Sequence, residues 1–451
     1  MRILWHMPTL RRRGCGLSIR AIELAKRLHI HGHLITFVVE QDKTDIADAE
    51  IEGMPLIRTV VPKRRPLHWC LQARSRREAA RWLVQHVLAG HGPAHDLMIS
   101  CQPEVVAAYT DQPERRPVVY VCVGTTLLHD AAEQAAQRAL PVARRLPFAL
   151  DRRLKHVNEA AAFTTADAMV FDSNQTRELV IAAYGAAPGR SHTIYGGVDE
   201  NHFRPPTPAE RRAARETLGI SENGYVVVWT GRLSPEKNLE LLLRAVACCR
   251  TRPERVVLVG DGPLKTELVQ LAVSERLGGS LMPDAGAGDG PALRGSRGSV
   301  VEFVGDQADV RPFLHAADVF AFPSRGESFG GAMVEAMACG LACVALRPDG
   351  RGVRTANAEI IEHQQSGLLA AEPTPQAFAA GIELLGVDAD LRRRLGRAAQ
   401  ARAREHFTWA VAARKLGDLI SKLVPVPPHS DIQLESGEQE ADRRRLSAVS
   451  D

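Results

Sequence analysis

The 451-residue sequence lacks several features that would place a protein in a specialised class. It has no run of about 18 apolar residues, so it predicts no membrane span. Its net charge of +4 is too small to predict nucleic-acid binding, and we expect no nucleic-acid partner. The first apolar stretch begins at Arg2, which leaves no room for a signal peptide, and we therefore expect a cytoplasmic protein.

The cysteines carry no signature of a metal site or of disulfides. None of the eight forms a C-x-x-C pair or stands near a cluster of histidines. We therefore interpret them as reduced and mostly buried side chains. They are Cys15, Cys70, Cys101, Cys122, Cys248, Cys249, Cys339 and Cys343.

What the sequence does contain is a regular alternation of short apolar runs with amphipathic helical stretches. In the first half, the runs predict strands at residues 3–5, 34–39, 97–101, 118–122, 168–171 and 192–195. The rhythm restarts in the second half, with strands predicted at 225–229, 256–259, 300–304, 318–322 and 341–346. Continuously apolar strands are typical of a parallel sheet that is covered on both faces, so we expect an α/β protein of two doubly wound, Rossmann-like domains facing across a cleft.

Three prolines within residues 203–208 indicate the boundary between the two domains. We assign residues 1–200 to the first domain, 201–408 to the second, and 409–424 to a helix that packs back on the first. The Gly-rich stretch 278–298 predicts a mobile loop, and the charged, Pro-rich tail 425–451 predicts disorder.

The stretch ESFGGAMVE at residues 327–335 is the most informative motif. Its two carboxylates, Glu327 and Glu335, flank a Gly-Gly step where an apolar run hands over to a good helix former. In open α/β sheets, ligands bind at such strand-to-helix turns, and the amino end of a helix offers free N–H groups to phosphate. The alternative is that Ser328 or Gly330 caps a helix and Glu335 faces solvent.

Together with other motifs, this stretch resembles the retaining glycosyltransferases of family 4, glycosyl transferases group 1, which have the GT-B fold. The resemblance covers roughly residues 160–425 and follows the family's order of motifs. The motifs that support the resemblance are YGGVD at 195–199 with FRP at 203–205, WTGRLSPEKN at 229–238, VGDGP at 259–263, VG at 304–305, the E-x7-E motif formed by Glu327 and Glu335, and FTW at 407–409.

The resemblance implies a nucleoside diphosphate sugar as donor and a hydroxyl compound as acceptor, with no cofactor and no metal. Arg232 and Lys237, at a strand end and in the first turn of the next helix, would neutralise the leaving diphosphate by electrostatic preorganisation. Glu327 would contact hydroxyls of the transferred sugar, and Glu335 would bind the donor ribose. The predicted catalytic residues are Arg232, Lys237 and Glu327, and the predicted donor-binding residues are Gly16, Gly231, Arg232, Lys237, Phe329, Gly330, Gly331 and Glu335.

The first half matches the family less closely. Gly14-Cys15-Gly16 follows the first strand but lacks the third glycine of a dinucleotide fingerprint. Many relatives carry a histidine where Val123 stands, so either His129 reaches the sugar or the protein works without that contact. A polar histidine on a helix face is the alternative for His129. Asp388 and Asp390 form a D-x-D pair, which we interpret as a helix cap because Leu391-Arg-Arg-Arg follows.

Basic residues interleaved with apolar ones gather in the first domain. A solvated helix face is the default interpretation, but such a stretch can also lie on anionic lipid, and we hypothesise a lipid-linked acceptor at the inner face of a membrane. The residues are Arg11, Arg12, Arg13, Lys63, Arg64, Arg65, Arg74, Arg76, Arg77 and Arg81, with Leu67, Trp69, Leu71, Trp82 and Leu83 among them.

Other functions are weighed against this one. A non-catalytic GT-B protein, acting as the partner subunit of an active transferase, is conceivable because the family histidine is absent. This alternative is disfavoured because a site that has lost its function loses its charged groups first, whereas this chain keeps Arg232, Lys237, Glu327 and Glu335. A dinucleotide-dependent dehydrogenase would need the full glycine fingerprint, and a phosphorylase would need a cofactor lysine that we do not identify.

Overall fold

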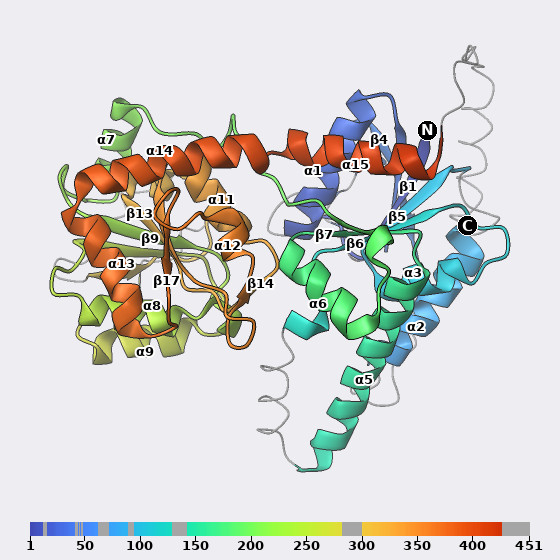
Figure 1. Cartoon of the computed structure of the whole chain (residues 1–451), viewed down its shortest axis with the longest axis horizontal. Coiled ribbons are helices and arrows are strands. Elements are labelled where there is room, and N and C mark those ends of the chain that lie inside the picture. Colours follow the sequence, from blue (N-terminus) through green and yellow to red (C-terminus); the bar gives the residue numbers. More distant parts are fainter. Residues whose placement is uncertain are drawn as a thin grey trace.

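The structure, a computed structural model, describes residues 1–11, 16–40, 44, 46, 48–61, 72–88, 94–128, 142–281 and 300–425. Each half of the chain builds one sheet, and helices cover both faces of each sheet (Figure 1). The predicted class of two doubly wound α/β domains is confirmed. His129, the Lys63 to Leu71 stretch, most of the Gly-rich loop and the tail lie outside the described residues.

The first sheet has the order β3-β4-β2-β1-β5-β6-β7-β8 and is parallel except for the β3–β4 pair. The strands of this sheet are apolar throughout because helices cover both of its faces. In β1, Ile3 and Trp5 pack towards α1 and α15, whereas Leu4 packs towards α2, α3 and α5. The strands are β1 Arg2–Met7, β2 Leu34–Glu40, β3 Glu50–Ile51, β4 Met54–Thr59, β5 Leu97–Ser100, β6 Val118–Cys122, β7 Ala168–Phe171 and β8 Ser191–Thr193. The helices are α1 Gly16–Ile30, α2 Gln72–Leu83, α3 Pro103–Thr110, α5 Val142–Thr165 and α6 Asn174–Tyr184, and a π-helical turn, Val84–Leu88, continues α2.

The second sheet has the order β11-β12-β10-β9-β13-β15-β17, and every pair in it is parallel. Its strands are β9 Val226–Thr230, β10 Arg255–Val259, β11 Gly278–Leu281, β12 Val301–Phe303, β13 Val319–Phe322, β15 Ala342–Leu346 and β17 Leu368–Ala370, and a separate parallel pair joins β14 Gly326–Glu327 to β16 Arg354–Thr355. The helices are α7 Pro208–Thr217, α8 Leu239–Cys248, α9 Lys265–Ser274, α10 Arg311–Ala316, α11 Gly331–Ala338, α12 Asn357–Ile360, α13 Pro375–Val387 and α14 Ala389–His406. One expectation is wrong here, because the start of the stretch predicted as a loop forms the edge strand β11.

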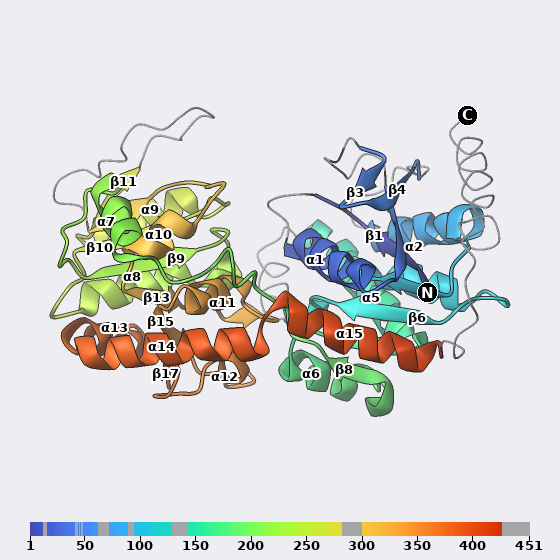
Figure 2. The ribbon, with the colours of Figure 1, turned by 90° about the horizontal axis from the view of Figure 1, so that it is seen from above.

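α15, Trp409–Leu423, crosses from the second domain and lies along α1 of the first (Figure 2). Trp409, Leu416 and Ile420 join the core of the first domain. At the crossing, the Val198 N–H donates to the Phe407 carbonyl at 2.8 Å, so the two connections between the domains run side by side. A Cβ on Gly197 would lie 2.5 Å from the Trp409 nitrogen, which explains a glycine at this point of the YGGVD motif.

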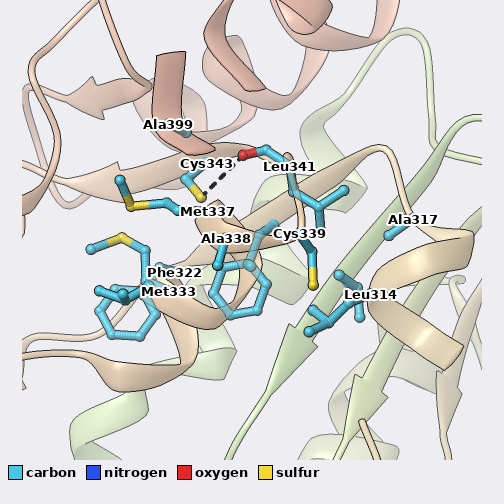
Figure 3. Packing of buried hydrophobic residues seen from close by; sticks show 14 of the residues in the cluster. Leu314, Ala317, Phe322, Met333, Met337, Ala338, Cys339, Leu341, Cys343 and Ala399 are labelled. Atoms are coloured by element: carbon cyan, nitrogen blue, oxygen red, sulfur yellow. Dashed lines mark hydrogen bonds between the residues drawn. The ribbon is translucent and has the colours of Figure 1, made fainter. Parts of the chain in front are cut away.

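The core beneath α11 is packed with sulfur and aromatic side chains (Figure 3). Met333 and Met337 of α11 share this cluster with Phe322, and Cys339 and Cys343 are buried in it as free thiols, with Cys339 next to Leu314. Burial raises the pKa of Cys339 to about 12, so this thiol stays protonated and acts as a small apolar side chain. The expectation of mostly buried cysteines holds at these positions, whereas Cys248 is exposed.

Of the basic stretch in the first domain, α2 lies within the described residues. Leu83 is buried, and Trp82 packs against the same core cluster, so the apolar side of α2 faces the domain interior. Arg76 forms an ion pair with Glu104 of α3. These contacts favour the interpretation of α2 as an ordinary helix with a solvated polar face.

Candidate active site

The predicted site starts where β9 ends, at Gly231. Gly231 and Gly260, after β10, adopt φ angles of +146° and +134°, which favour glycine. A Cβ on Gly260 would lie 1.8 Å from the Gly231 carbonyl oxygen, and the Gly231 N–H donates to the Val259 carbonyl at 2.9 Å. The carboxyl ends of the two strands therefore meet backbone to backbone, and this fixes the position of Arg232.

The sequence predicted Lys237 in the first turn of α8, and this prediction is wrong. Lys237 instead ends a 3₁₀ turn, Pro235–Lys237, and Asn238 separates that turn from α8 with a φ of 54°. The Asn238 side chain donates to the Pro323 carbonyl at 3.1 Å, and the Arg325 N–H donates to the Glu236 carbonyl at 2.9 Å. These two bonds tie the turn to the segment after β13, which carries the E-x7-E motif.

Lys237 and Glu327 form an ion pair between segments 90 residues apart in the chain. Both side chains are about one fifth exposed, at 19% and 21%. The Arg232 side chain is exposed, and none of the described residues donates to it, accepts from it or forms an ion pair with it. Two of the predicted catalytic residues are therefore in direct contact, and the third is available for an anionic ligand.

The amino end of α11 has no side-chain cap. Gly330 precedes the helix with a φ of +89°, and a Cβ there would lie 3.0 Å from the Phe322 ring, so glycine is needed at this position. A Cβ on Gly331 would meet nothing within 4 Å, so the protein itself does not require a glycine there.

Glu335 lies in α11 and is partly buried. No described side chain forms a hydrogen bond or ion pair with its carboxylate. Burial raises the pKa of Glu335 to about 7, because desolvation disfavours the charged form and nothing offsets it. The carboxylate is therefore neither structurally paired nor simply solvated, which is the state expected of a group that binds a ligand.

The other predicted residues lie in different surroundings. The Phe329 ring is buried against Tyr195 and Phe407, with centroids 6.2 and 5.8 Å away, so only its backbone is left for a donor contact. Gly16 is exposed at the start of α1. Val123 is partly buried and packs against the core of the first domain.

Contacts between the domains show that the carboxyl edges of the two sheets meet at this site. The Arg354 guanidinium donates to the Leu127 carbonyl, after β6, at 2.7 Å. The hydroxyls of Thr176, on α6, and Ser328 are 3.2 Å apart. Sequence reasoning missed Arg354 and the nearby Glu359, because no motif carries them and only the folded chain brings them to the first domain.

The described residues contain no group of three or more His, Cys, Asp or Glu side chains that could hold a metal ion. The side chain of Asp388 accepts from the Leu391 N–H at 2.8 Å at the start of α14, and Asp390 pairs with Arg393. The D-x-D pair therefore serves the helix start, as predicted. No helix within the described residues is long and apolar enough to cross a membrane.

Comparison with protein families gives two adjacent matches. The model described as Glycosyltransferase Family 4 matches residues 15–202, and the model described as Glycosyl transferases group 1 matches residues 224–388.

Among curated proteins, D-inositol 3-phosphate glycosyltransferase 2 of Catenulispora acidiphila is 33% identical over 278 residues, which cover 59% of this chain and 59% of the relative. D-inositol 3-phosphate glycosyltransferase of Jonesia denitrificans is 31% identical, with 57% of each chain covered. The chain thus spans about three fifths of the length of these curated relatives.

Solved structures match over nearly the whole chain. HepE of Anabaena, in complex with UDP and glucose, superposes with a TM-score of 0.66 at 21% identity. The superposition covers 93% of this chain and 99% of HepE. Sucrose-phosphate synthase from Thermosynechococcus elongatus superposes with a TM-score of 0.70 at 20% identity, covering 94% and 98%. At this identity the likeness shows the fold, and it confirms the predicted GT-B architecture.

Proposed function

This chain belongs to the group 1 glycosyltransferases of family 4, and from that premise we propose that it moves a hexosyl unit from a UDP- or GDP-sugar to a hydroxyl acceptor, with retention of configuration and without a metal ion. The observation that carries the proposal is the Lys237–Glu327 ion pair, together with the exposed and unpaired side chain of Arg232 at the end of β9. Lys237, from the segment after β9, and Glu327, from the segment after β13, meet in this ion pair, and Arg232 lies on the segment of Lys237, as the binding of a diphosphate with its attached sugar would require.

The proposed chemistry is electrostatic. As the bond between sugar and diphosphate breaks, negative charge grows on the leaving phosphate, and Arg232 and Lys237 would stabilise it. Each donor group of this kind contributes roughly 2.7 to 4 kcal/mol to the transition state. The uncapped amino end of α11 adds N–H groups and a favourable helix dipole for the same anion.

The two glutamates have separate roles in this proposal. Glu327 would hold the hydroxyls of the transferred sugar next to the Lys237 ammonium, while the unpaired Glu335 would accept hydrogen bonds from the ribose. Neither is cast as the acid or nucleophile of a glycosidase. Retention would instead follow from attack of the acceptor hydroxyl on the face that the diphosphate leaves.

A two-step experiment tests the proposal. Thermal unfolding is measured with UDP, GDP and ADP. A nucleotide that binds the folded protein, present at a concentration of 100 times its Kd, should stabilise the protein by about 2.7 kcal/mol. Hydrolysis of the matching nucleotide sugar without acceptor then separates an active site from one that only binds. Stabilisation without any turnover across a panel of donors would instead favour the non-catalytic partner subunit.

The acceptor panel should contain phosphorylated polyols, because the curated relatives are named for D-inositol 3-phosphate. It should also contain lipid-linked acceptors. On α5, Leu146 is 79% exposed and Leu150 is also exposed, close to Arg144 and Arg145, a combination that suits an anionic lipid surface. We propose peripheral membrane contact on this basis, and flotation with anionic liposomes should show association at low salt that is lost at high salt.

A further inference from the structure

The carboxylate of Glu359 belongs to the second domain but is bound by the first. Glu359 lies on α12, and its two oxygens accept hydrogen bonds from the backbone N–H groups of Asn174, at 2.7 Å, and Gln175, at 2.8 Å. These are the first two residues of α6 in the first domain. The carboxylate therefore bridges the two domains through the amino end of a helix.

The chemistry of this contact makes it a specific one. The first N–H groups of a helix have no partner within the helix, and they carry the positive end of its dipole. Ser173, the residue before α6, accepts from the Thr176 N–H, which leaves the N–H groups of Asn174 and Gln175 for Glu359. Hydrogen bonds to an ionised carboxylate are about twice as strong as neutral ones.

Tyr195, in the connection between the domains, completes the contact. Its hydroxyl donates to Glu359 at 2.9 Å and accepts from the Asn174 side chain at 3.0 Å. Burial, with the nearby charge of Glu359, raises the pKa of Tyr195, so the phenol keeps the proton that it donates. We name Glu359, Asn174, Gln175 and Tyr195 the domain clasp.

The clasp has rigid support on the second-domain side. Arg402 of α14 donates to the backbone carbonyls of Glu359, at 2.9 Å, and Ile360, at 2.7 Å, and so fixes α12. On the other side, Thr176 of α6 meets the hydroxyl of Ser328, the neighbour of Glu327. The amino end of α6 is thus held both by the clasp and by the loop that carries the sugar-binding carboxylate.

We propose that Glu359 is a positioning residue for glycosyl transfer: by holding α6 it fixes the first domain relative to the donor loop at residues 327–330. This inference rests on the proposed function, and it places the acceptor on the first domain, opposite the donor-binding residues of the second. Transfer between them needs both substrates in one geometry, and a displacement of about 1 Å can reduce the rate by about 100-fold. The side chains proposed to bind the nucleotide, Arg232, Lys237 and Glu335, all belong to the second domain.

The test compares Glu359→Ala with Glu383→Ala. Glu383 is a matched control because its carboxylate also accepts from two consecutive backbone N–H groups, those of Arg250 and Thr251, but entirely within the second domain. For Glu359→Ala we expect kcat for transfer to fall by up to about 100-fold, the Kd for UDP to stay unchanged, and the radius of gyration in X-ray scattering to rise. Glu383→Ala should leave all three quantities close to those of the unmodified protein.

Conservative variants make the result specific to the clasp. Glu359→Gln keeps one acceptor oxygen without the charge, and Tyr195→Phe removes the hydrogen bonds to Glu359 and from Asn174 but keeps the two from the backbone of α6, so both should lie between the unmodified protein and Glu359→Ala. Unchanged kcat and scattering in Glu359→Ala, or equal losses in both alanine variants, would overturn the inference. If the unmodified protein transfers no sugar, the proposed function fails, while the scattering comparison still decides whether Glu359 holds the domains together.

Discussion

Replacing Lys237 by alanine separates a catalytic role from a structural one, because the structure indicates that the loss of folding stability will be small. The lysine and its partner Glu327 are each about one fifth exposed. Partly exposed ion pairs contribute at most about 1 kcal/mol to stability. For a domain of this size the melting temperature should therefore fall by no more than about 4 °C. A role on the leaving diphosphate would be worth roughly 2.7 to 4 kcal/mol, a loss of about 100- to 1,000-fold in turnover.

The assay is steady-state release of nucleotide from the donor identified by thermal shift, with unfolding followed on the same preparations. Lys155→Ala is the control, since Lys155 also forms an ion pair of limited exposure, with Asp151 on α5, remote from the strand ends of the second domain. We expect similar small losses of stability in both variants and a loss of turnover in Lys237→Ala alone. Turnover within threefold of the unmodified protein in Lys237→Ala would refute the diphosphate role.

Three further predictions concern the carboxylates and the domain connection. Glu327→Ala should damage sugar transfer while UDP affinity, measured by calorimetry, stays nearly unchanged, whereas Glu335→Ala should weaken UDP itself; equal UDP affinities would remove the division of labour. The pKa of Glu335 is raised to about 7 in the folded state, so the native protein binds an extra proton, and stability should fall by up to about 3 kcal/mol as pH rises from about 4.5 to 7. Glu335→Gln should remove that slope in urea unfolding measured across this pH range, and a slope that persists would assign it to other groups. Gly197→Ala would place a Cβ 2.5 Å from the Trp409 nitrogen, and it should cost about 1 to 3 kcal/mol in urea unfolding, unlike Gly189→Ala, where the Cβ meets nothing within 4 Å.

The sequence predicts this fold well because its strands are buried on both faces and therefore read as unbroken apolar runs. The strands that the sequence does not predict are β3, β4, β11, β14, β16 and β17. In the β3–β4 hairpin, the turn rests on positive φ angles at Glu52 and Gly53, which an apolar pattern does not reveal. The resemblance to the family also predicts that Lys237 and Glu327 belong to one site, and the structure brings them into contact.

The remaining features depend on contacts that are distant in sequence. The 3₁₀ turn that carries Lys237 is held by hydrogen bonds with Pro323 and Arg325. Helix propensity is a local property and cannot predict these distant contacts. Phe329 sits inside the best motif, yet its ring packs at the domain junction, because Gly196 leaves room for it. Glu359 has no local signal at all, since its partners lie 185 and 184 residues away.

The passage of α15 back onto α1 has a consequence for biosynthesis. The first 200 residues leave the ribosome with the α1 side of their sheet still lacking Trp409, Leu416 and Ile420. That apolar face stays open to water until more than 200 further residues have been translated, so the amino-terminal half cannot mature as an independent unit. Folding of the protein is therefore completed by a helix that is translated late, and a nascent chain arrested before residue 409 should bind chaperones.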